Sequence, residues 1–193
     1  MSRWCCYGDT QVGTACVEAL EAAGYRVIMP RQHVCCGLPL YDYGFLDVAE
    51  KYLRRTLSLL SEEIRNGTPL VGMEPSCLAV FRAEMIKMLP NNQDAQRLSQ
   101  NCFHWAEFFQ KKNLEVPKLD AKAVVWGHCH HKATGGLDPE MELKKMGLDA
   151  KEAKGGCCGL AGSWGFEKGG TRSRCNAAKS VCCRQRGMPT PRL

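Results

Sequence analysis

Apolar residues recur at helical spacing along the first part of the chain. The pattern predicts helices over four segments: Val12–Ala23, Phe45–Arg65, Leu78–Leu89 and Asp94–Lys112. Gly24 directly follows the first, Gly67 lies two residues beyond the end of the second, and both are suited to end these helices. The second helix has the clearest apolar stripe, made by Leu46, Ala49, Tyr52 or Leu53, Leu57, Leu60 and Ile64. This stripe predicts one buried face.

Short apolar runs between these segments predict strands. They are Arg3–Tyr7, Tyr25–Met29, Pro69–Met73 and Ala121–Trp126. Strands that alternate with helices are joined by parallel crossovers, so we expect an α/β fold with short parallel sheets covered by helices. Such folds place their sites just beyond the carboxyl ends of the strands.

An internal repeat divides the sequence. "GDT" at 8–10 and "CCGLPL" at 35–40 correspond to "GHC" at 127–129 and "CCGLAG" at 157–162. The intervals are similar, with 25 residues between Asp9 and Cys35 and 27 between Cys129 and Cys157. We therefore predict two tandem, pseudo-repeated lobes, 1–116 and 117–169, of which the second is incomplete.

The positive charge of the chain lies in its last segment. Residues 170–193 hold six basic residues and no acidic one, whereas residues 1–169 have 20 of each sign. The lobes therefore give no electrostatic reason to expect a nucleic-acid partner. Two interpretations of the segment 170–193 stay open: a basic tail, or a stretch translated in a shifted reading frame.

Cysteine usage and hydropathy bear on the compartment. The chain has 13 cysteines, and no window approaches the roughly 18 consecutive apolar residues of a membrane span. The N-terminus does not resemble a secretory signal. We therefore expect a cytoplasmic protein, in which thiols bind metals or carry out redox chemistry rather than form structural disulfides.

Two Cys-Cys-Gly motifs are the strongest chemical signal. They are Cys35-Cys36-Gly37 and Cys157-Cys158-Gly159. Adjacent cysteines point in different directions on a regular strand or helix, so both thiols reach one site only from a loop, where glycine permits a tight turn. Thiolates select zinc, copper(I) or iron–sulfur centres.

Further candidate ligands follow the predicted strands. Glu74 and Cys77 come after Pro69–Met73, and Asp9 comes after the first strand. His128 and Cys129 follow the fourth strand. Each is a competent metal ligand, but Glu74 and Asp9 are equally suited to cap the helices that start beside them.

These motifs resemble the cysteine-rich (CCG) domain of iron–sulfur oxidoreductases. The stretches "CCGLPLYDYGFLDVAEKYLRR", "VGMEPSCLAVFRAE", "GHCHHKA" and "CCGLAGSWGFE" carry the resemblance. It is strongest to the C-terminal region of FAD-linked D-lactate dehydrogenase and glycolate oxidase-type proteins. It extends to the cysteine-rich subunits of heterodisulfide reductase and of anaerobic glycerol-3-phosphate dehydrogenase.

The resemblance implies an iron–sulfur centre, of the [4Fe–4S] type, that passes electrons between a dehydrogenase and an acceptor. It assigns as ligands Cys35, Cys36 and Cys77 in the first copy, and Cys129, Cys157 and Cys158 in the second. Asp9 or Thr10 stands where the family's leading cysteine is expected, and Glu74 replaces the first cysteine of Cys-x-x-Cys. Glu74, Asp9 and His128 are therefore additional candidate ligands.

The same resemblance implies a partner. FAD would be held by a flavoprotein dehydrogenase subunit or domain that acts on a 2-hydroxy acid such as lactate or glycolate. The chain would then be an oxidoreductase component that is catalytically incomplete alone. It would span no membrane, and any peripheral membrane association would run through the partner.

Three other hypotheses stay open. The first is a structural zinc site, for which Cys129, Cys157, Cys158 and His128 make a Cys₃His set. The second is a thiol–disulfide redox domain that uses a vicinal Cys-Cys pair with Cys77 as resolving thiol. The third is a metal-free interaction fragment.

Overall fold

The computed structural model describes residues 10–30, 32–115, 118–127, 129–137, 146–153, 164–170 and 172. The chain divides into two compact units, Met1–Glu115 (unit 1) and Val116–Leu193 (unit 2). The predicted strand Arg3–Tyr7 lies outside the described residues.

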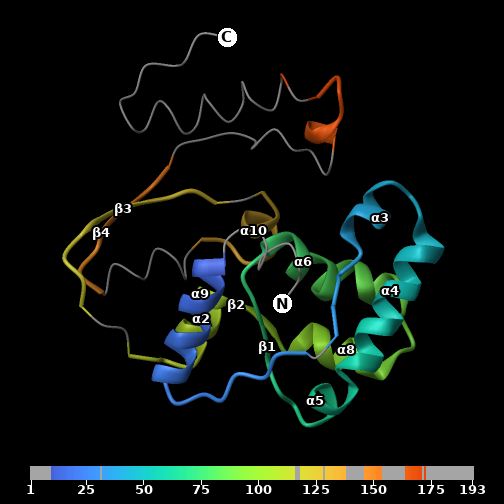
Figure 1. Cartoon of the computed structure of the whole chain (residues 1–193), viewed down its shortest axis with the longest axis horizontal. Helices are drawn as coiled ribbons and strands as arrows, with labels where there is room; N and C mark the ends of the chain where they lie inside the picture. The colour runs from blue at the N-terminus through green and yellow to red at the C-terminus, as the bar shows by residue number, and fades with distance from the viewer. Residues whose placement is uncertain are drawn as a thin grey trace. The chain divides into compact units, whose positions relative to one another are not determined.

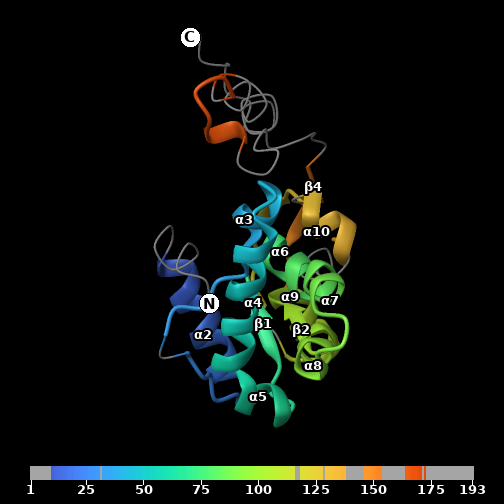
Figure 2. The same cartoon turned by 90° about the vertical axis from the view of Figure 1, so that its right-hand side faces the viewer.

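Unit 1 consists of helices packed around a short parallel sheet of two strands. Its helices are α2 (Thr10–Ala22), α3 (Leu38–Asp42), α4 (Leu46–Leu59), α5 (Ser61–Arg65), α6 (Pro75–Ala79), the π-helical η1 (Val80–Glu84), α7 (Met85–Met88), α8 (Gln93–Gln100) and α9 (Trp105–Lys111). Strand β1 (Leu70–Gly72) pairs in parallel with β2 (Cys102–His104). In Figures 1 and 2, β1 lies in the interior of the unit among α2, α4 and α8.

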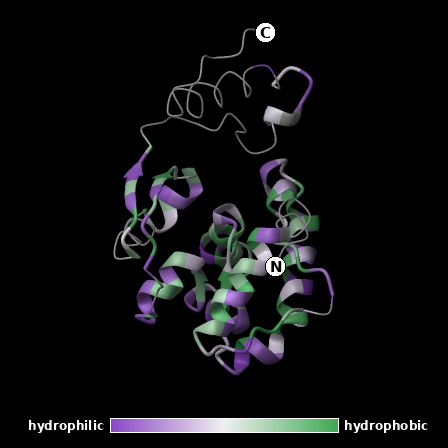
Figure 3. Ribbon diagram, turned by 60° about the vertical axis from the view of Figure 1, so that its left-hand side comes forward, coloured by the Kyte–Doolittle hydropathy of each residue, from purple (hydrophilic) through white to green (hydrophobic). Residues whose placement is uncertain are grey.

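Unit 2 contains a second parallel pair. Strand β3 (Lys122–Val125) pairs with β4 (Asp149–Glu152), and the other described elements are α10 (Cys129–Thr134) and the 3₁₀ turn η3 (Trp164–Phe166). Helices joined to two short parallel sheets confirm the predicted α/β class. The strand β4 shows strong hydrophilic colouring in Figure 3, and only Ala150 on it is buried.

The apolar stripe of the second predicted helix forms the centre of the core. Ala49, Leu53 and Leu57 of α4 are buried, whereas Tyr52 is 40% exposed, so Leu53 is the inward residue of the two candidates. The predicted single helix is interrupted at Leu60, whose φ of −108° separates α4 from α5. Leu46 is also exposed, so the stripe begins one turn later than predicted.

The predicted helix Asp94–Lys112 is wrong in its middle. Residues Cys102–His104 leave the helical path and pair with Leu70–Gly72. Helical periodicity is a local signal. In this segment the backbone hydrogen bonds to the edge of β1 determine the structure instead. Cys102, the first residue of β2, is 1% exposed and belongs to the core.

The predicted strand Tyr25–Met29 is also wrong. This segment has no strand structure, because within residues 10–30 and 32–115 the only ladder joins β1 to β2. An apolar run becomes a strand only where a neighbour pairs its backbone groups. The segment instead lines a mainly apolar cavity of about 750 Å³ that none of the predicted site residues lines.

The remaining predicted helices are present with shifted ends. Helix α2 ends at Ala22, and Gly24 follows it with a φ of +86°, as expected for a glycine stop. The segment predicted as Leu78–Leu89 begins earlier, at Pro75, and runs through α6, η1 and α7.

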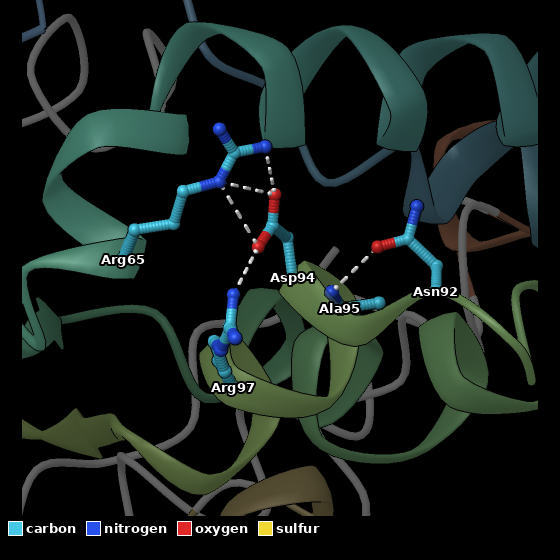
Figure 4. A network of polar contacts seen from close by, with 5 residues as sticks. All are labelled: Arg65, Asn92, Asp94, Ala95 and Arg97. Atoms are coloured by element: carbon cyan, nitrogen blue, oxygen red, sulfur yellow. Dashed lines mark hydrogen bonds and ion pairs between the residues drawn. The ribbon is translucent and has the colours of Figure 1, made fainter.

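A polar network joins α5 to α8 at the surface of unit 1 (Figure 4). Arg65 Nη2 lies 2.8 Å from Asp94 Oδ2, and Arg97 Nη1 lies 2.9 Å from Asp94 Oδ1. Asn92 caps α8, because its side-chain oxygen accepts a 2.9 Å hydrogen bond from Ala95 N. The hydrogen bond from Arg65 favours the ionised carboxylate and lowers the pKa of Asp94.

Candidate functional site

The first Cys-Cys-Gly motif forms a tight loop between an extended segment and α3. Gly37 has a φ of +77°, a left-handed conformation that disfavours other residues, and its carbonyl accepts hydrogen bonds from the N–H groups of Leu40 and Tyr41. The hydroxyl of Thr56 on α4 donates to the carbonyl of Cys35 at 3.1 Å. The loop is thereby fixed to the buried face of α4.

The third candidate cysteine is presented by a strand-to-helix junction. Strand β1 ends at Gly72, where a Cβ atom would lie 2.9 Å from the side chain of Leu78 on α6. A larger residue at position 72 would therefore require the Leu78 side chain to shift, so glycine favours this close approach of strand and helix. Pro75 occupies the first turn of α6, and Cys77 lies two residues further on.

Two of the three candidate thiols meet at this junction. Cys36 Sγ donates a hydrogen bond to Cys77 Sγ at 3.2 Å, although the residues are 41 apart in sequence. Cys36 is 5% exposed, whereas Cys35 and Cys77 are partly exposed. The structure thus brings Cys36 and Cys77, two of the three ligands predicted for the first copy, into contact, and Cys35 precedes Cys36 in the same loop.

The thiols differ in acidity. A hydrogen bond from the Cys36 side chain, with help from the Gly37 backbone and His33, lowers the pKa of Cys35 to about 6 despite burial. The pKa of Cys36 is raised, because its hydrogen bonds to Cys35 and Cys77 and its burial favour the neutral thiol. The two adjacent thiols of the Cys-Cys-Gly loop therefore differ in the direction of their pKa shifts.

Glu74 acts as a helix cap. It is the N-cap residue of α6, and its Oε1 atom accepts hydrogen bonds from the backbone N–H of Ser76 at 3.2 Å and from the Ser76 hydroxyl. A carboxylate at this position also suits the helix dipole. Of the two roles expected for Glu74, capping is the one that the contacts display.

A small cavity adjoins the thiols. It measures about 50 Å³ and is lined by Cys36, Cys77 and Glu74 together with apolar residues of the core, among them Val34, Leu78 and Phe81. Soft sulfur donors at the rim of an apolar cavity suit a thiophilic metal centre. Within the part of the chain that the structure describes, however, no three His, Cys, Asp or Glu side chains surround one point as a preformed metal site would require.

Unit 2 presents its candidate cysteine in a similar way. Strand β3 is followed by Gly127 and by α10, which begins at Cys129. A Cβ atom on Gly127 would lie 2.6 Å from the side chain of Leu137, so glycine is again favoured by close packing. Cys129 is exposed, whereas His131 on the same helix is buried.

The other predicted ligands lie outside the described residues. These are Asp9, His128, Cys157 and Cys158. The structure therefore carries information on the first candidate site and on Cys129 alone.

Sequence reasoning missed Thr56. Its hydroxyl holds the Cys35 carbonyl, and the residue is 2% exposed. A signal was present, because Thr56 is a polar residue within the otherwise apolar inner face of α4. A buried hydroxyl needs a hydrogen-bond partner. A buried threonine on an apolar helix face therefore indicates that its hydroxyl bonds to, and holds in place, a neighbouring backbone segment.

The family assignment agrees with this geometry. Residues 4–82 match the family model CCG, described as "Cysteine-rich domain". The match contains Cys35, Cys36 and Cys77. The match lies in the first part of the chain, and it confirms the resemblance to cysteine-rich (CCG) domains that the motifs predicted.

The chain is similar to a subunit of a dehydrogenase and to lactate utilization proteins. The chain is 28% identical over 170 residues to one of the subunits of anaerobic glycerol-3-phosphate dehydrogenase from Escherichia coli (strain K12), covering 84% of this chain and 42% of that protein. It is 29% identical over 169 residues to lactate utilization protein A of Bacillus velezensis, covering 81% and 68%. It is 28% identical over 191 residues to the Bacillus subtilis (strain 168) protein of the same name, covering 93% and 78%.

The extent of these matches differs. The chain spans less than half the length of the glycerol-3-phosphate dehydrogenase subunit.

No solved structure matches the chain. Among the described residues, no helix is long and apolar enough to cross a membrane.

Proposed function

We propose that the chain is an iron–sulfur electron-transfer module of a flavin-linked dehydrogenase for a small 2-hydroxy acid. The observation that carries the proposal is the contact between the thiols of Cys36 and Cys77 at the carboxyl end of β1, with Cys35 next to Cys36 in the Cys-Cys-Gly loop. The CCG family match supports an iron–sulfur role, and the lactate utilization relatives support a lactate-type substrate.

The donor set fits such a centre. Cys35, Cys36 and Cys77 would hold it in unit 1, with Glu74 as a further candidate, and a bound [4Fe–4S] centre would supply one-electron transfer. Asp9 is a further candidate in the same copy. In the second copy the proposed ligands are Cys129, Cys157 and Cys158, with His128 beside them.

The chain's own residues would prepare the site. Gly37 and Thr56 hold the Cys-Cys loop, and the close packing of Gly72 on Leu78 sets the position of Cys77. The apolar residues around the cavity would limit water access, which is one of the ways a protein tunes the potential of a metal centre. FAD and the hydroxy acid would be bound by a partner subunit or domain.

The test is metal and sulfide analysis of anaerobically purified protein. We expect iron and acid-labile sulfide at about four each per bound centre, with a broad absorption band near roughly 400 nm that bleaches with dithionite. Cys36→Ser and Cys77→Ser should lower the iron content. Cys16→Ser is the matched control, because Cys16 lies on α2 and does not line the thiol cavity.

Other results would overturn the proposal. About one zinc per chain without sulfide would favour the structural zinc hypothesis. Metal-free protein that takes up neither iron nor zinc on reconstitution would favour an interaction fragment. Equal iron contents in wild type, Cys36→Ser and Cys77→Ser would exclude the first Cys-Cys-Gly loop as the site.

A further inference from the structure

The contact between the thiols of Cys36 and Cys77 is also relevant to disulfide formation. Their sulfur atoms lie 3.2 Å apart, and disulfide sulfurs lie about 2.05 Å apart. An approach of little more than 1 Å would therefore join them, which side-chain rotation within a loop and at the start of a helix can supply. The two thiols are close enough for a bond to form between them without a change of fold.

We propose that Cys36 and Cys77 form a thiol–disulfide switch that controls loading of the metal site. In the reduced state both thiols are available as ligands. In the oxidised state a Cys36–Cys77 disulfide removes two of the three thiols of the first copy. The inference rests on the proposed function for its consequence, but the disulfide itself can be tested without any metal.

The local structure selects this pair over the adjacent one. Consecutive Cα atoms are about 3.8 Å apart, whereas disulfides usually join Cα atoms about 4.4–6.8 Å apart. A Cys35–Cys36 disulfide would therefore distort the loop that Gly37 and Thr56 hold in place. Cys77 comes from a different element and is not subject to this constraint.

Differences in exposure set the order of the steps. Cys77 is partly exposed, whereas Cys36 is 5% exposed. The proposed oxidant is a small disulfide of the glutathione class. The Cys77 thiolate attacks one of its sulfurs, forms a mixed disulfide and releases one thiolate. The Cys36 thiolate then attacks the sulfur of Cys77 and releases the second, so that two protein thiols become one disulfide and the oxidant becomes two thiols.

The apolar surroundings of the two sulfur atoms are compatible with the oxidised form. The sulfur atoms line the small apolar cavity beside Leu78 and Phe81. A disulfide has no charge and needs no hydrogen bond, so its burial there costs less than burial of a thiolate without a metal. The switch would thus protect the metal-free protein from loading until a dithiol reductant is present.

The experiment uses the full chain made metal-free, reduced and then treated with oxidised glutathione. We expect peptide mapping to recover a Cys36–Cys77 crosslink and the thiol count to fall by about two. Cys36→Ser should stop at a stable glutathione adduct on Cys77. Cys77→Ser should form neither the crosslink nor that adduct. Cys16→Ser and Cys102→Ser are controls that should crosslink as wild type does.

Iron loading then separates this inference from the proposed function. Oxidised protein should take up iron and sulfide only after dithiothreitol is added, whereas reduced protein should load directly. If the Cys36–Cys77 crosslink forms but the reduced protein takes up no iron and sulfide, the proposed function is refuted. The disulfide itself is then still supported. Loading of reduced protein with no Cys36–Cys77 crosslink, or with a Cys35–Cys36 disulfide in its place, would overturn the switch.

Folding of the variants is checked separately. Far-ultraviolet circular dichroism is compared between Cys36→Ser, Cys77→Ser and wild type before oxidation. If Cys36→Ser loses its helical signal, wild-type peptide mapping alone decides, because the absence of the crosslink there overturns the proposal without any variant.

Discussion

The two units present a cysteine by the same device and surround it differently. In unit 1 the strand β1 ends at a closely packed Gly72, and α6 then carries Cys77. In unit 2 the strand β3 is followed by a closely packed Gly127, and α10 begins at Cys129. Cys77 touches another thiol, whereas Cys129 is exposed. A strand-to-helix junction can place a thiol, but a second loop must supply its neighbours.

The difference extends to packing. The buried cluster of unit 1 draws on α4, α5, α6, α7 and α8 around the β1–β2 sheet. Unit 2 has fewer buried hydrophobic residues among those described: Leu137, Ala150 and Ala153. Mutations at matched positions in the two units should therefore have unequal effects.

The largest difference is expected in thiol reactivity. In reduced, metal-free protein, Cys129 should react with N-ethylmaleimide roughly tenfold or more faster than Cys36, because a buried thiol reacts only after local opening. Pulse labelling followed by peptide mass spectrometry measures both rates in one sample. Denatured protein is the control, in which the two rates should converge. Equal rates in the native protein would show that the Cys-Cys-Gly loop is open.

Truncation of the core should have the next largest effect. Met85 is 0% exposed, so Met85→Ala should lower the free energy of unfolding by about 2–5 kcal/mol. Val124→Ala on β3 is the matched control, because Val124 is 63% exposed and its change should stay within about 0.5 kcal/mol. Urea unfolding followed by circular dichroism measures both. Similar losses would contradict the difference in packing between the units.

Ion pairs give a smaller contrast. Arg82 forms an ion pair with Glu107, and the side chains of these two residues are 18% and 30% exposed, respectively. Arg82 also donates a hydrogen bond to the backbone carbonyl of Cys102 at 2.7 Å. Glu107→Gln should cost about 1–3 kcal/mol, because the guanidinium loses a charged partner at a partly buried position.

Unit 2 offers the matched pair. Lys132 and Glu152 lie 2.9 Å apart with side chains 40% and 49% exposed, so Lys132→Met should change stability by about 0–1 kcal/mol. Chemical denaturation of both variants checks the contrast. A larger loss for Lys132→Met than for Glu107→Gln would contradict it.

The smallest effect concerns acid stability. The pKa of Asp94 is lowered by its hydrogen bond and charge interaction with Arg65, so its contribution to stability is present above its ordinary value of 3.8. That contribution is lost as the pH falls through the lower pKa of the folded state. Asp94→Asn should lower the Tm near pH 7, and the difference from wild type should shrink towards about pH 3.

The control for this prediction lies on β4. Asp149 is 3.9 Å from Lys151, and its side chain is 55% exposed. Asp149→Asn should leave the Tm close to that of wild type at every pH. A constant Tm difference for Asp94→Asn across the acid range would contradict an ionic role for this carboxylate.

Local patterns in the sequence determined much of unit 1. The stripe of α4, the stop at Gly24 and the turn at Gly37 each depend on side-chain spacing or on one backbone conformation, and all are present. The order of Cys-Cys-Gly, strand and Glu-Pro-Ser-Cys also placed Cys36 and Cys77, the two thiols in contact, among the candidate ligands. Glu74 remained ambiguous, because capping and ligation use the same carboxylate.

Tertiary structure alone decided the pairing. Nothing local to Cys102–His104 distinguishes it from the helix around it, and only the edge of β1 makes it a strand. Tyr25–Met29 has a strand-like composition but lacks a described partner. The 3.2 Å contact of Cys36 with Cys77 likewise depends on the packing of Gly72 against Leu78. Hydrophobic periodicity describes one segment at a time. Strand pairing and binding sites join segments that are distant in sequence, so only the tertiary structure determines them.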